Sequence, residues 1–548
     1  MRIHFPSILV LIGASLLSAC GGSSSSSAST TPSGPTLGPP SSTLVRVSQA
    51  SPYAANCGGG AGDPTATSFE DAEVEPYLAI NPSNPSNLVG AWQQDRWSDG
   101  GAHGLVAGSS MDGGKTWKRH KLPLSICAGG TQANGGNYAR ASDPWVSISP
   151  DGTAYIISIS FTGATLQPGS SGGVLVSRSR DGGVTWSEAA TLIHDGASAF
   201  NDKETLTADP TDSHFVYAVW DRLTRSDHGA AMFARTTDGG STWETATAIY
   251  DPGVGNQTLG NEIVVASDGT LVDVFEEIDN TSNNMDAIAD IRVITSTDHG
   301  VTWSAPVTVA SDQSVGASDP NTGKLIRSGA GLAQMAAGPG GTLAVVWEDG
   351  RFSKGNHDGI AYAGSSDDGA HWSKPVEINS VHGVSAFTPS VAVLADGTVG
   401  VSYFDFRNDA AGATLPTDYW FTSSTDGVHW SEQHISGPFD LALAPDAEGL
   451  FIGDYEALGT VGSTFVPFFV QTNDAGTDNR NDAYYLPPQP KPLMVVHKVS
   501  RVALAVETSP PDVRFRHKVH ENIMRLLRDE DPVWDAIRAE RQAPSQPP

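Results

Sequence analysis

One short polar motif recurs six times along this chain and constrains its fold more than any other feature. The motif reads Ser/Thr-x-Asp-x-Gly-x-x-Trp, as in residues 179–186. Further copies occupy residues 110–117, 236–243, 296–303 and 365–372, and a copy one residue shorter occupies 424–430. Successive motif aspartates lie 69, 57, 60, 69 and 59 residues apart. So regular a period predicts a repeat architecture.

Each residue of the motif suits a tight turn between two strands. The carboxylate of Asp181 can accept backbone N–H bonds inside its own turn, and the glycines supply positions with φ > 0. Trp186 then opens the next strand as a large apolar anchor with one polar N–H. We therefore interpret the motifs as structural and not catalytic.

The apolar runs around each motif predict four strands per repeat. In the sixth repeat these runs occupy residues 388–393, 399–406, 418–423 and 430–435. Four short strands per repeat, rich in Val, Ile, Thr and Tyr, are typical of the blades of a β-propeller. The sequence therefore predicts an all-β fold, a β-propeller built on these repeats.

The number of blades depends on strand-like runs that lie outside the six repeats. Three such runs, 450–455, 465–471 and 482–486, come after the sixth motif and carry no motif of their own, and one spare run, 43–47, precedes the first repeat. The three late runs and the one early run together supply the four strands of a seventh blade. In such a blade the N-terminal strand closes the ring and removes exposed strand edges. Seven blades are favoured over six.

The charge balance argues against a nucleic-acid partner. The formal net charge is −29, whereas nucleic-acid binding needs a basic surface. Such acidity more simply keeps a protein soluble.

The N-terminal segment predicts export. Residues 1–20 hold one early arginine, an apolar run and then Leu-Ser-Ala-Cys, which is the pattern of a signal peptide. Its end resembles the lipobox of bacterial lipoproteins, which would make Cys20 the lipidated first residue of a membrane-anchored mature chain. The alternative is an ordinary cleaved signal with an incidental cysteine. Residues 21–42, rich in Ser, Gly and Pro, predict a flexible tether.

Two further cysteines, Cys57 and Cys127, lie in glycine-rich loops on either side of the first repeat. In an exported protein two remaining cysteines most simply pair. We predict one disulfide that closes the first repeat.

The chain beyond the predicted propeller (43–488) is of a different kind. Residues 489–548 begin with a proline-rich linker, and then Phe515, Val519, Ile523, Leu526 and Leu527 recur at helical spacing. This pattern predicts a short amphipathic helix. A loosely attached tail is favoured over a helix docked on the propeller.

Charged residues recur at one end of the predicted strands. The start of each first strand lies beside the end of each second strand, so both sets share one face around the axis. First-strand starts carry Glu75, Asp143, Asp202, Lys203, Glu204, Glu262 and Asp454, and second-strand ends carry Asp95, Arg96, Asp221, Arg222, Glu276, Glu277, Asp349, Arg351, Asp405 and Arg407. These groups form either a ligand site or Asp–Arg pairs that bridge adjacent blades.

The repeated motif resembles the Asp box, or BNR repeat, of the sialidase superfamily. The resemblance covers residues 75–435 and implies a propeller. Sialidases are retaining glycosidases with a Tyr nucleophile backed by a Glu, an Asp acid/base and three Arg that bind the sialate carboxylate. The family's Arg-Ile-Pro motif is absent, and Val74-Glu75-Pro76-Tyr77 occupies its place.

The resemblance implies roles for residues that match the family pattern. Asp99 would be the acid/base and Tyr455 the nucleophile, with Glu204 or Glu262 activating it. Tyr403 and Tyr419 compete with Tyr455 for the nucleophile role. Anion contacts would come from Arg96, Arg222, Arg351 and Arg407, and Arg140 is the candidate to replace the missing arginine. We expect no metal and no cofactor.

Two functions remain open for this chain. The first is an exported sialidase-like glycosidase that acts on terminal sugars of glycoconjugates. The second is a non-catalytic propeller that binds a glycan or a protein through its axial face.

Overall fold

A computed structural model describes residues 43–59, 65–224, 229–279, 288–473, 479–488, 501–502 and 513–530, with the side chains of 527–530 left out. All of these residues lie in the compact unit Pro39–Pro548. The predicted signal peptide, Cys20, the predicted tether and the segment around Trp534 lie outside the described residues.

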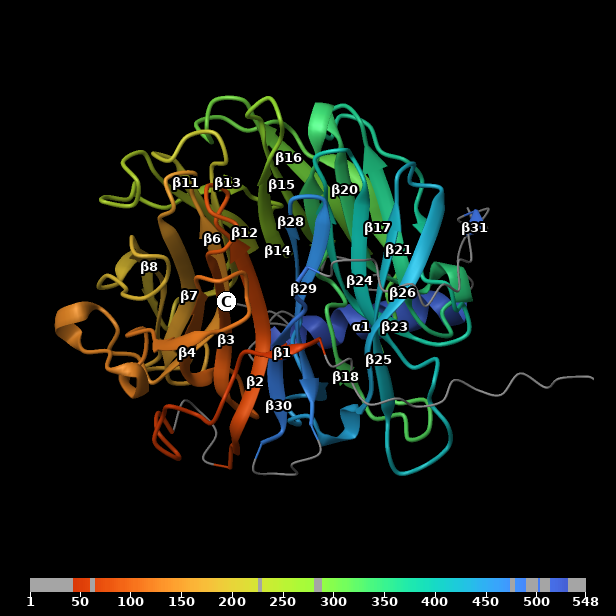
Figure 1. Ribbon diagram of the computed structural model, residues 1–548, viewed down its shortest axis with the longest axis horizontal. Coiled ribbons are helices and arrows are strands. Elements are labelled where there is room, and N and C mark those ends of the chain that lie inside the picture. Colours follow the sequence, from red (N-terminus) through yellow and green to blue (C-terminus); the bar gives the residue numbers. More distant parts are fainter. Residues whose placement is uncertain are drawn as a thin grey trace, which may run out of the picture. The chain divides into compact units, whose positions relative to one another are not determined.

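The described chain is almost entirely β, and its strands follow one another in antiparallel groups of four (Figure 1). The first group consists of β2 (Ser68–Ile80), β3 (Leu88–Trp97), β4 (Ala102–Ser110) and β5 (Lys118–Lys121). The second group consists of β6 (Arg140–Ile148), β7 (Ala154–Thr162), β8 (Ser171–Ser179) and β9 (Ala190–Gly196). The next two are β10 (Ala199–Ala208), β11 (Val216–Thr224), β12 (Gly229–Thr236), β13 (Thr247–Tyr250) and β14 (Asn256–Val265), β15 (Leu271–Asp279), β16 (Ile288–Ser296), β17 (Val307–Asp312). Two more are β19 (Gln334–Ala337), β20 (Leu343–Asp349), β21 (Gly359–Ser365), β22 (Val376–Glu377) and β23 (Ala386–Val393), β24 (Val399–Asp405), β25 (Pro416–Ser424), β26 (His429–Asp440). This arrangement is consistent with the predicted β-propeller.

The two ends of the strand region meet in one sheet. β28 (Ala457–Val461), β29 (Thr464–Thr472) and β30 (Asn481–Tyr485) pair in order, and β1 (Val45–Arg46) adds to β30 with Val45 opposite Tyr485. A single parallel bridge, Ala72 to Asn481, joins β30 to β2. Figure 1 shows β1, β2 and β30 side by side. The N-terminal run is therefore paired, as the sequence predicts.

Two short strands lie between the groups. β18 (Ile326–Arg327) pairs in parallel with β27 (Leu450–Phe451), which fixes the segment before β19 against the segment before β28. β31 (Arg501–Val502) adds to the outer edge of β26.

The motif turns have the predicted hydrogen bonds. In the copy around Asp181, Oδ1 accepts from the backbone N–H of Val184 (3.1 Å) and of Thr185 (2.9 Å), while Oδ2 accepts from the Thr185 hydroxyl (2.6 Å). The Trp186 indole donates to the carbonyl of Gly183 (3.1 Å). Burial alone would raise the pKa of Asp181, but the bonds to its carboxylate lower it to about 2.

The core depends on the second strands more than on the motif tryptophans. Trp92, Trp220 and Trp347 lie inside β3, β11 and β20, and all three are fully buried. Trp186 packs only partly buried against a neighbouring cluster. The largest core contributions therefore come from second strands, which lie inside each group.

Cys57 and Cys127 form a disulfide, with the sulfur atoms 2.16 Å apart across 70 residues of sequence. The bond ties the loop before β2 to the loop after β5, so it spans the first strand group. In the usual account, such a bond stabilises mainly by restricting the unfolded chain.

The C-terminal helix α1 (Val513–Glu530) packs on the strands, so the expectation of a loosely attached tail is wrong for this segment. Phe515, Val519 and Ile523 are buried on one side of the helix, in a cluster with Leu223 and Leu259. The spacing of these apolar residues is helical, and the partner surface that they need lies far away in the sequence. Within the described part of the chain, no helix is both long and apolar enough to cross a membrane.

The two kinds of tryptophan give the first prediction. Trp220→Ala removes a fully buried indole, and we expect a loss of about 3–5 kcal/mol in the free energy of unfolding. Trp186→Ala is expected to cost clearly less, because Trp186 is only partly buried. Urea denaturation followed by circular dichroism measures both. Equal losses would contradict the assignment of the core to the second strands.

Candidate functional site

A repeated irregularity of the first strands creates the site. In β2, β6, β10, β14 and β23 the pairing with the next strand shifts by one residue. The first residue of each bulge has a positive φ, and these residues are Glu75 (53°), Asp143 (53°), Lys203 (51°), Gly260 (67°) and Thr388 (48°). This conformation costs free energy for a residue other than glycine, and such strain gathers at functional sites.

Three of these bulges bring charged side chains together around Lys203. Its Nζ lies 2.8 Å from Asp454 Oδ2, 3.3 Å from Asp143 Oδ2 and 3.9 Å from Glu75 Oε1. All four side chains are nearly inaccessible to solvent. Burial by itself lowers the pKa of Lys203, but Asp143 and Asp454 hold it well above its usual value. Lys203 therefore stays charged and joins β2, β6 and β10 to the segment before β28.

Two arginines complete this charged cluster. Arg327 donates to both oxygens of Asp454 (3.1 and 2.9 Å), and Arg96 donates to Gln93 (2.9 Å), which itself donates to Glu75. Both guanidinium groups lie over the ring of Phe451, at 4.8 Å for Arg96 and 4.6 Å for Arg327. We call Glu75, Arg96, Asp143, Lys203, Arg327 and Asp454 the axial cluster.

A small pocket of about 30 Å³ opens beside the axial cluster. Its lining includes two members of the cluster, Asp143 and Lys203, and the side chains of Trp145, Glu204, Glu262, Leu332 and Tyr455. We call this the acidic pocket. Its volume holds about one water molecule.

The carboxyl groups of the acidic pocket differ in protonation. Burial raises the pKa of Glu262 to about 8 and, with the nearby charge of Asp143, raises that of Glu204 well above its usual range. Burial opposes ionisation of Asp143 too, but Lys203 and the Ser142 hydroxyl lower its pKa. Carboxyls whose pKa values are shifted in opposite directions thus share one pocket, an arrangement that is compatible with acid–base chemistry.

Tyr455 contributes a phenol to the same pocket. Its hydroxyl donates to the carbonyl of Pro144 (3.1 Å), and its ring packs edge-on against Trp145 at 5.3 Å. Burial, with the charges of Glu75 and Asp143, raises the pKa of Tyr455 well above its usual value. In these surroundings Tyr455 is a neutral hydrogen-bond donor.

The structure brings only some of the predicted site residues together. Tyr455, Glu204 and Glu262 line the acidic pocket, and Arg96 lies in the axial cluster. Asp99 instead accepts from Arg140 (2.5 Å), whose guanidinium lies 4.4 Å from the ring of Trp97.

The other predicted arginines make contacts with outer strands. Arg222 donates two bonds to Asp195 on β9 (2.9 and 2.8 Å). Arg351 pairs with Asp349 (2.7 Å) and also contacts the carbonyl of Ser311 on β17. Arg407 pairs with Asp405 (2.6 Å) and with Glu432 on β26 (2.5 Å). Only Arg222 forms the predicted kind of Asp–Arg pair between neighbouring strand groups, while Arg351 reaches the neighbouring group through a backbone carbonyl and Arg407 pairs within its own group.

Sequence reasoning misses the centre of the site. The strand-end pattern includes Asp143 and Lys203 without giving them a role, although Lys203 is the one lysine among the acidic strand starts. Arg327 has no signal in the sequence, because the short pairing of β18 with β27 positions it.

One group of side chains outside the axial cluster has the geometry of a metal site. Ligand atoms of Glu70, Asp95 and His103 all lie within 4.8 Å of one another. His103 Nδ1 lies 2.9 Å from Asp95 Oδ2, and its Nε2 lies 3.1 Å from the Ser68 hydroxyl. Both ring nitrogens thus already have protein partners, and these side chains need no ion to be satisfied.

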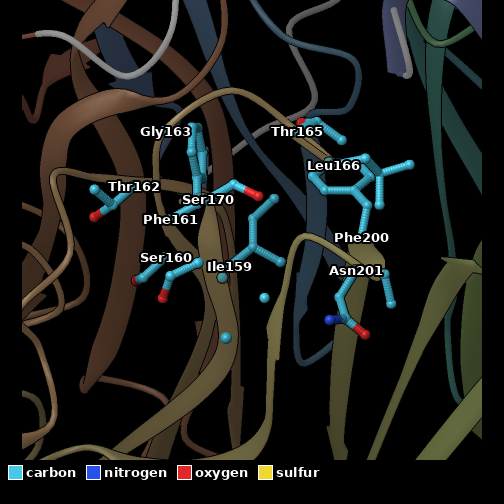
Figure 2. A pocket seen from close by; sticks show the side chains of 15 residues that line it. Ile159, Ser160, Phe161, Thr162, Gly163, Thr165, Leu166, Ser170, Phe200 and Asn201 are labelled. Carbon is cyan, nitrogen blue, oxygen red and sulfur yellow. The ribbon is translucent and has the colours of Figure 1, made fainter. Parts of the chain in front are cut away.

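A second pocket of about 30 Å³ lies between the end of β7 and the starts of β8 and β10 (Figure 2). Phe161, Leu166 and Phe200 give it apolar walls, and Thr162 and Asn201 add polar groups. Its lining holds no charged side chain, so it offers no acid or base.

Comparison with known proteins agrees with the repeat. Residues 214–433 match the BNR repeat-like domain family. This match confirms the BNR repeat over that part of the chain. No curated protein matches the sequence.

Solved structures similar to this chain are distant from it. A Dyadobacter fermentans protein of unknown function is 15% identical, covering 62% of this chain and 95% of its own, with a TM-score of 0.38. A point mutant of the NanB sialidase of Streptococcus pneumoniae is 13% identical, covering 80% and 70%, with a TM-score of 0.39. The α-L-arabinofuranosidase Arb93A of Fusarium graminearum is 14% identical, covering 63% and 93%, with a TM-score of 0.40. Likenesses of this size establish no shared activity.

The axial cluster gives the second prediction. Lys203→Met leaves the buried carboxylates of Asp143 and Asp454 without their shared cation, and we expect a loss of about 3–5 kcal/mol of stability at neutral pH. Lys203 lowers the pKa of Asp143 and Asp454, so its contribution is present above about pH 4, the unfolded value, and is lost as pH falls further.

Chemical denaturation of wild type and variant between pH 7 and pH 3 measures this difference. The difference in the free energy of unfolding between wild type and variant should become smaller as the carboxyls become protonated. Lys118→Met, at an exposed lysine of β5, is the control and should cost little. If this difference stayed constant between pH 7 and pH 3, the charges assigned to these side chains would be wrong.

Proposed function

We propose that this protein is a glycoside hydrolase that removes a terminal sugar from a glycan. One observation carries the proposal: Asp143, Glu204, Glu262 and Tyr455 line a single buried pocket. Glycosidases of most families use one protonated and one ionised carboxyl group at the bond that is cleaved.

The pKa differences suggest a role for each carboxyl. Glu204 Oε1 accepts from the N–H of Ile159, while its Oε2 is buried without a hydrogen-bond partner. We assign Glu204 as the acid that protonates the leaving oxygen. Asp143, ionised beside Lys203, is suited to stabilise the positive charge that develops on the sugar or to activate water.

The remaining predicted residues take supporting roles in this proposal. The phenol of Tyr455 is suited to orient a sugar hydroxyl, because its acidic surroundings oppose a phenolate nucleophile. Asp99 is paired with Arg140 and is not among the residues that line the acidic pocket.

The charge of the site favours an uncharged sugar. Arg327 is occupied by Asp454, and Glu75 lies beside Arg96 where a sialate carboxylate would need free cations. A carboxylate ligand would have to compete with Asp454 for Arg327, which costs affinity. We therefore propose a neutral terminal sugar over the sialic acid that the resemblance implies.

The wider setting of the protein is part of the same proposal. We propose seven blades, with β1 completing the group of β28, β29 and β30. The signal-like residues 1–20 and Cys20 support an exported lipoprotein of the bacterial cell envelope, attached to the membrane by its lipid and facing external glycans.

The alternative is a propeller that binds a glycan or protein through its axial face without catalysis. The small volume of the acidic pocket favours it, because about 30 Å³ cannot admit a sugar ring in this conformation.

The third prediction tests the enzyme. Full-length protein is assayed with aryl glycosides of a neutral sugar, such as an α-L-arabinofuranoside, and with an aryl α-sialoside. We expect the wild-type protein to hydrolyse a neutral glycoside. Glu204→Gln should lower turnover of a natural glycoside about 10²- to 10⁴-fold, because the leaving group is then no longer protonated. Activity should also fall at alkaline pH as Glu204 ionises.

Glu188→Gln, at an exposed glutamate beyond a motif turn, is the control and should leave turnover unchanged. Turnover of the sialoside alone would contradict the neutral sugar. No turnover of any glycoside, together with saturable binding to a glycan, would replace the enzyme with the binding protein.

A further inference from the structure

Helix α1 covers the end of the strands where the axial cluster opens. Its buried residues Phe515, Val519 and Ile523 contact a cluster formed by side chains at strand ends. That cluster contains Leu166 after β7, Leu223 in β11, Leu259 in β14, Ile278 in β15 and Ala289 in β16. Each of these lies at the end of a second strand or the start of a first or third strand, which is the axial end. Figure 1 shows α1 crossing the strands in dark blue.

The strand ends are shaped to receive this helix. A Cβ placed on Gly355 would lie 2.2 Å from the ring of Phe515, and one on Gly331 would lie 2.6 Å from Leu526. A Cβ on Gly316 would likewise lie 2.5 Å from the guanidinium of Arg525. Any side chain at these three glycines would collide with α1, so the helix packs directly on backbone.

Polar contacts fix the position of α1 along this surface. Asn522 Nδ2 donates to the Ser314 hydroxyl (2.9 Å), and both side chains are buried. Lys518 donates to the carbonyl of Gly355 (2.6 Å). Both partners lie in loops that follow β17 and β20, so the helix is held to two strand groups.

The segment under α1 is also the wall of the acidic pocket. Leu332 lines the pocket and packs at the same time in the cluster that holds Phe515 and Ile523. A Cβ on Gly260, another lining residue, would lie 2.7 Å from Leu332 Cδ2. Residues 331–334 thus lie between the helix on one side and Glu262 and Glu204 on the other, and we call them the pocket wall.

We propose that α1 is a lid that holds the pocket wall in its closed position, and that release of α1 opens the acidic pocket to a glycan. The pocket has room for about one water in this structure, so a glycan needs this movement before it can reach Glu204. The position of the lid follows from contacts alone, and only the identity of the ligand rests on the proposed function.

Hydrogen exchange on the full-length protein tests the lid without any assay of activity. Val519→Asp puts a charge into the buried face of α1, whereas Val513→Asp makes the same change at an exposed position of the same helix. We expect Val519→Asp to speed amide exchange about ten-fold or more in α1 and in the pocket wall, and not in the motif turn 179–186. Val513→Asp should change none of these.

Release of α1 with undiminished protection of the pocket wall would overturn the proposal. Faster exchange in the motif turn as well would also overturn it, because the variant would then loosen the whole fold and not a lid.

A tether supplies the opposite perturbation. Ser314→Cys combined with Asn522→Cys places two thiols where a hydrogen bond now joins the side chains. The oxidised double variant should exchange more slowly than wild type at the pocket wall and show glycoside turnover lowered about ten-fold, with recovery on reduction. Wild type given the same reductant controls for opening of the Cys57–Cys127 bond.

The two proposals fail in different ways. If hydrogen exchange at the pocket wall responds to changes in α1 but the protein hydrolyses no glycoside, the lid proposal is supported and the enzyme proposal is rejected. If glycoside turnover is equal in the oxidised and the reduced double variant, the enzyme proposal is supported and the lid proposal is rejected.

Discussion

The buried ammonium of Lys203 is the interaction on which the axial end depends. It lies among Glu75, Asp143 and Asp454, which come from two different strand groups and the segment before β28. The charges of Lys203, Asp143 and Asp454 would each be costly to bury alone, and together with Arg327 they balance, whereas burial raises the pKa of Glu75 well above its usual range. Positions hundreds of residues apart in sequence are thereby fixed in one arrangement. The bulges in β2, β6 and β10 are what allow these side chains to point to one place.

This arrangement also explains why neighbouring carboxyls differ. Asp143 lies 3.3 Å from Lys203, which lowers the pKa of its carboxyl. Burial and the nearby charge of Asp143 instead raise the pKa of Glu204. Environment, and not residue type, sets the two states. Three residues of the cluster, Glu75, Asp143 and Lys203, also have a positive φ, a conformation that costs free energy for a residue other than glycine.

The other end of the strands follows a different physical rule. There each motif aspartate is bonded within eight residues, as Asp181 is with Val184 and Thr185, and a few longer contacts add to this, such as the bond from Asn87 Nδ2 to the carbonyl of Gly182 (3.0 Å). The protein therefore separates a locally stabilised end from an axial end that is stabilised by long-range ion pairs and by α1. Variation at the axial end leaves the repeat intact, which is how one fold can support different functions.

The sequence by itself determined the repeat, the all-β class and the pairing of the first strand with the last group, because each depends on local turn chemistry and on a strand pattern. It also placed Glu204, Glu262 and Tyr455 at one end, because antiparallel neighbours put first-strand starts beside second-strand ends. Only the tertiary structure decided that Lys203 and Arg327 complete the cluster and that Arg222, Arg351 and Arg407 turn to outer strands. The same holds for α1, whose apolar stripe is visible in sequence while its partner surface is not. A side chain's partner across a bulge or from a distant loop depends on register and packing, and neither is encoded in local sequence.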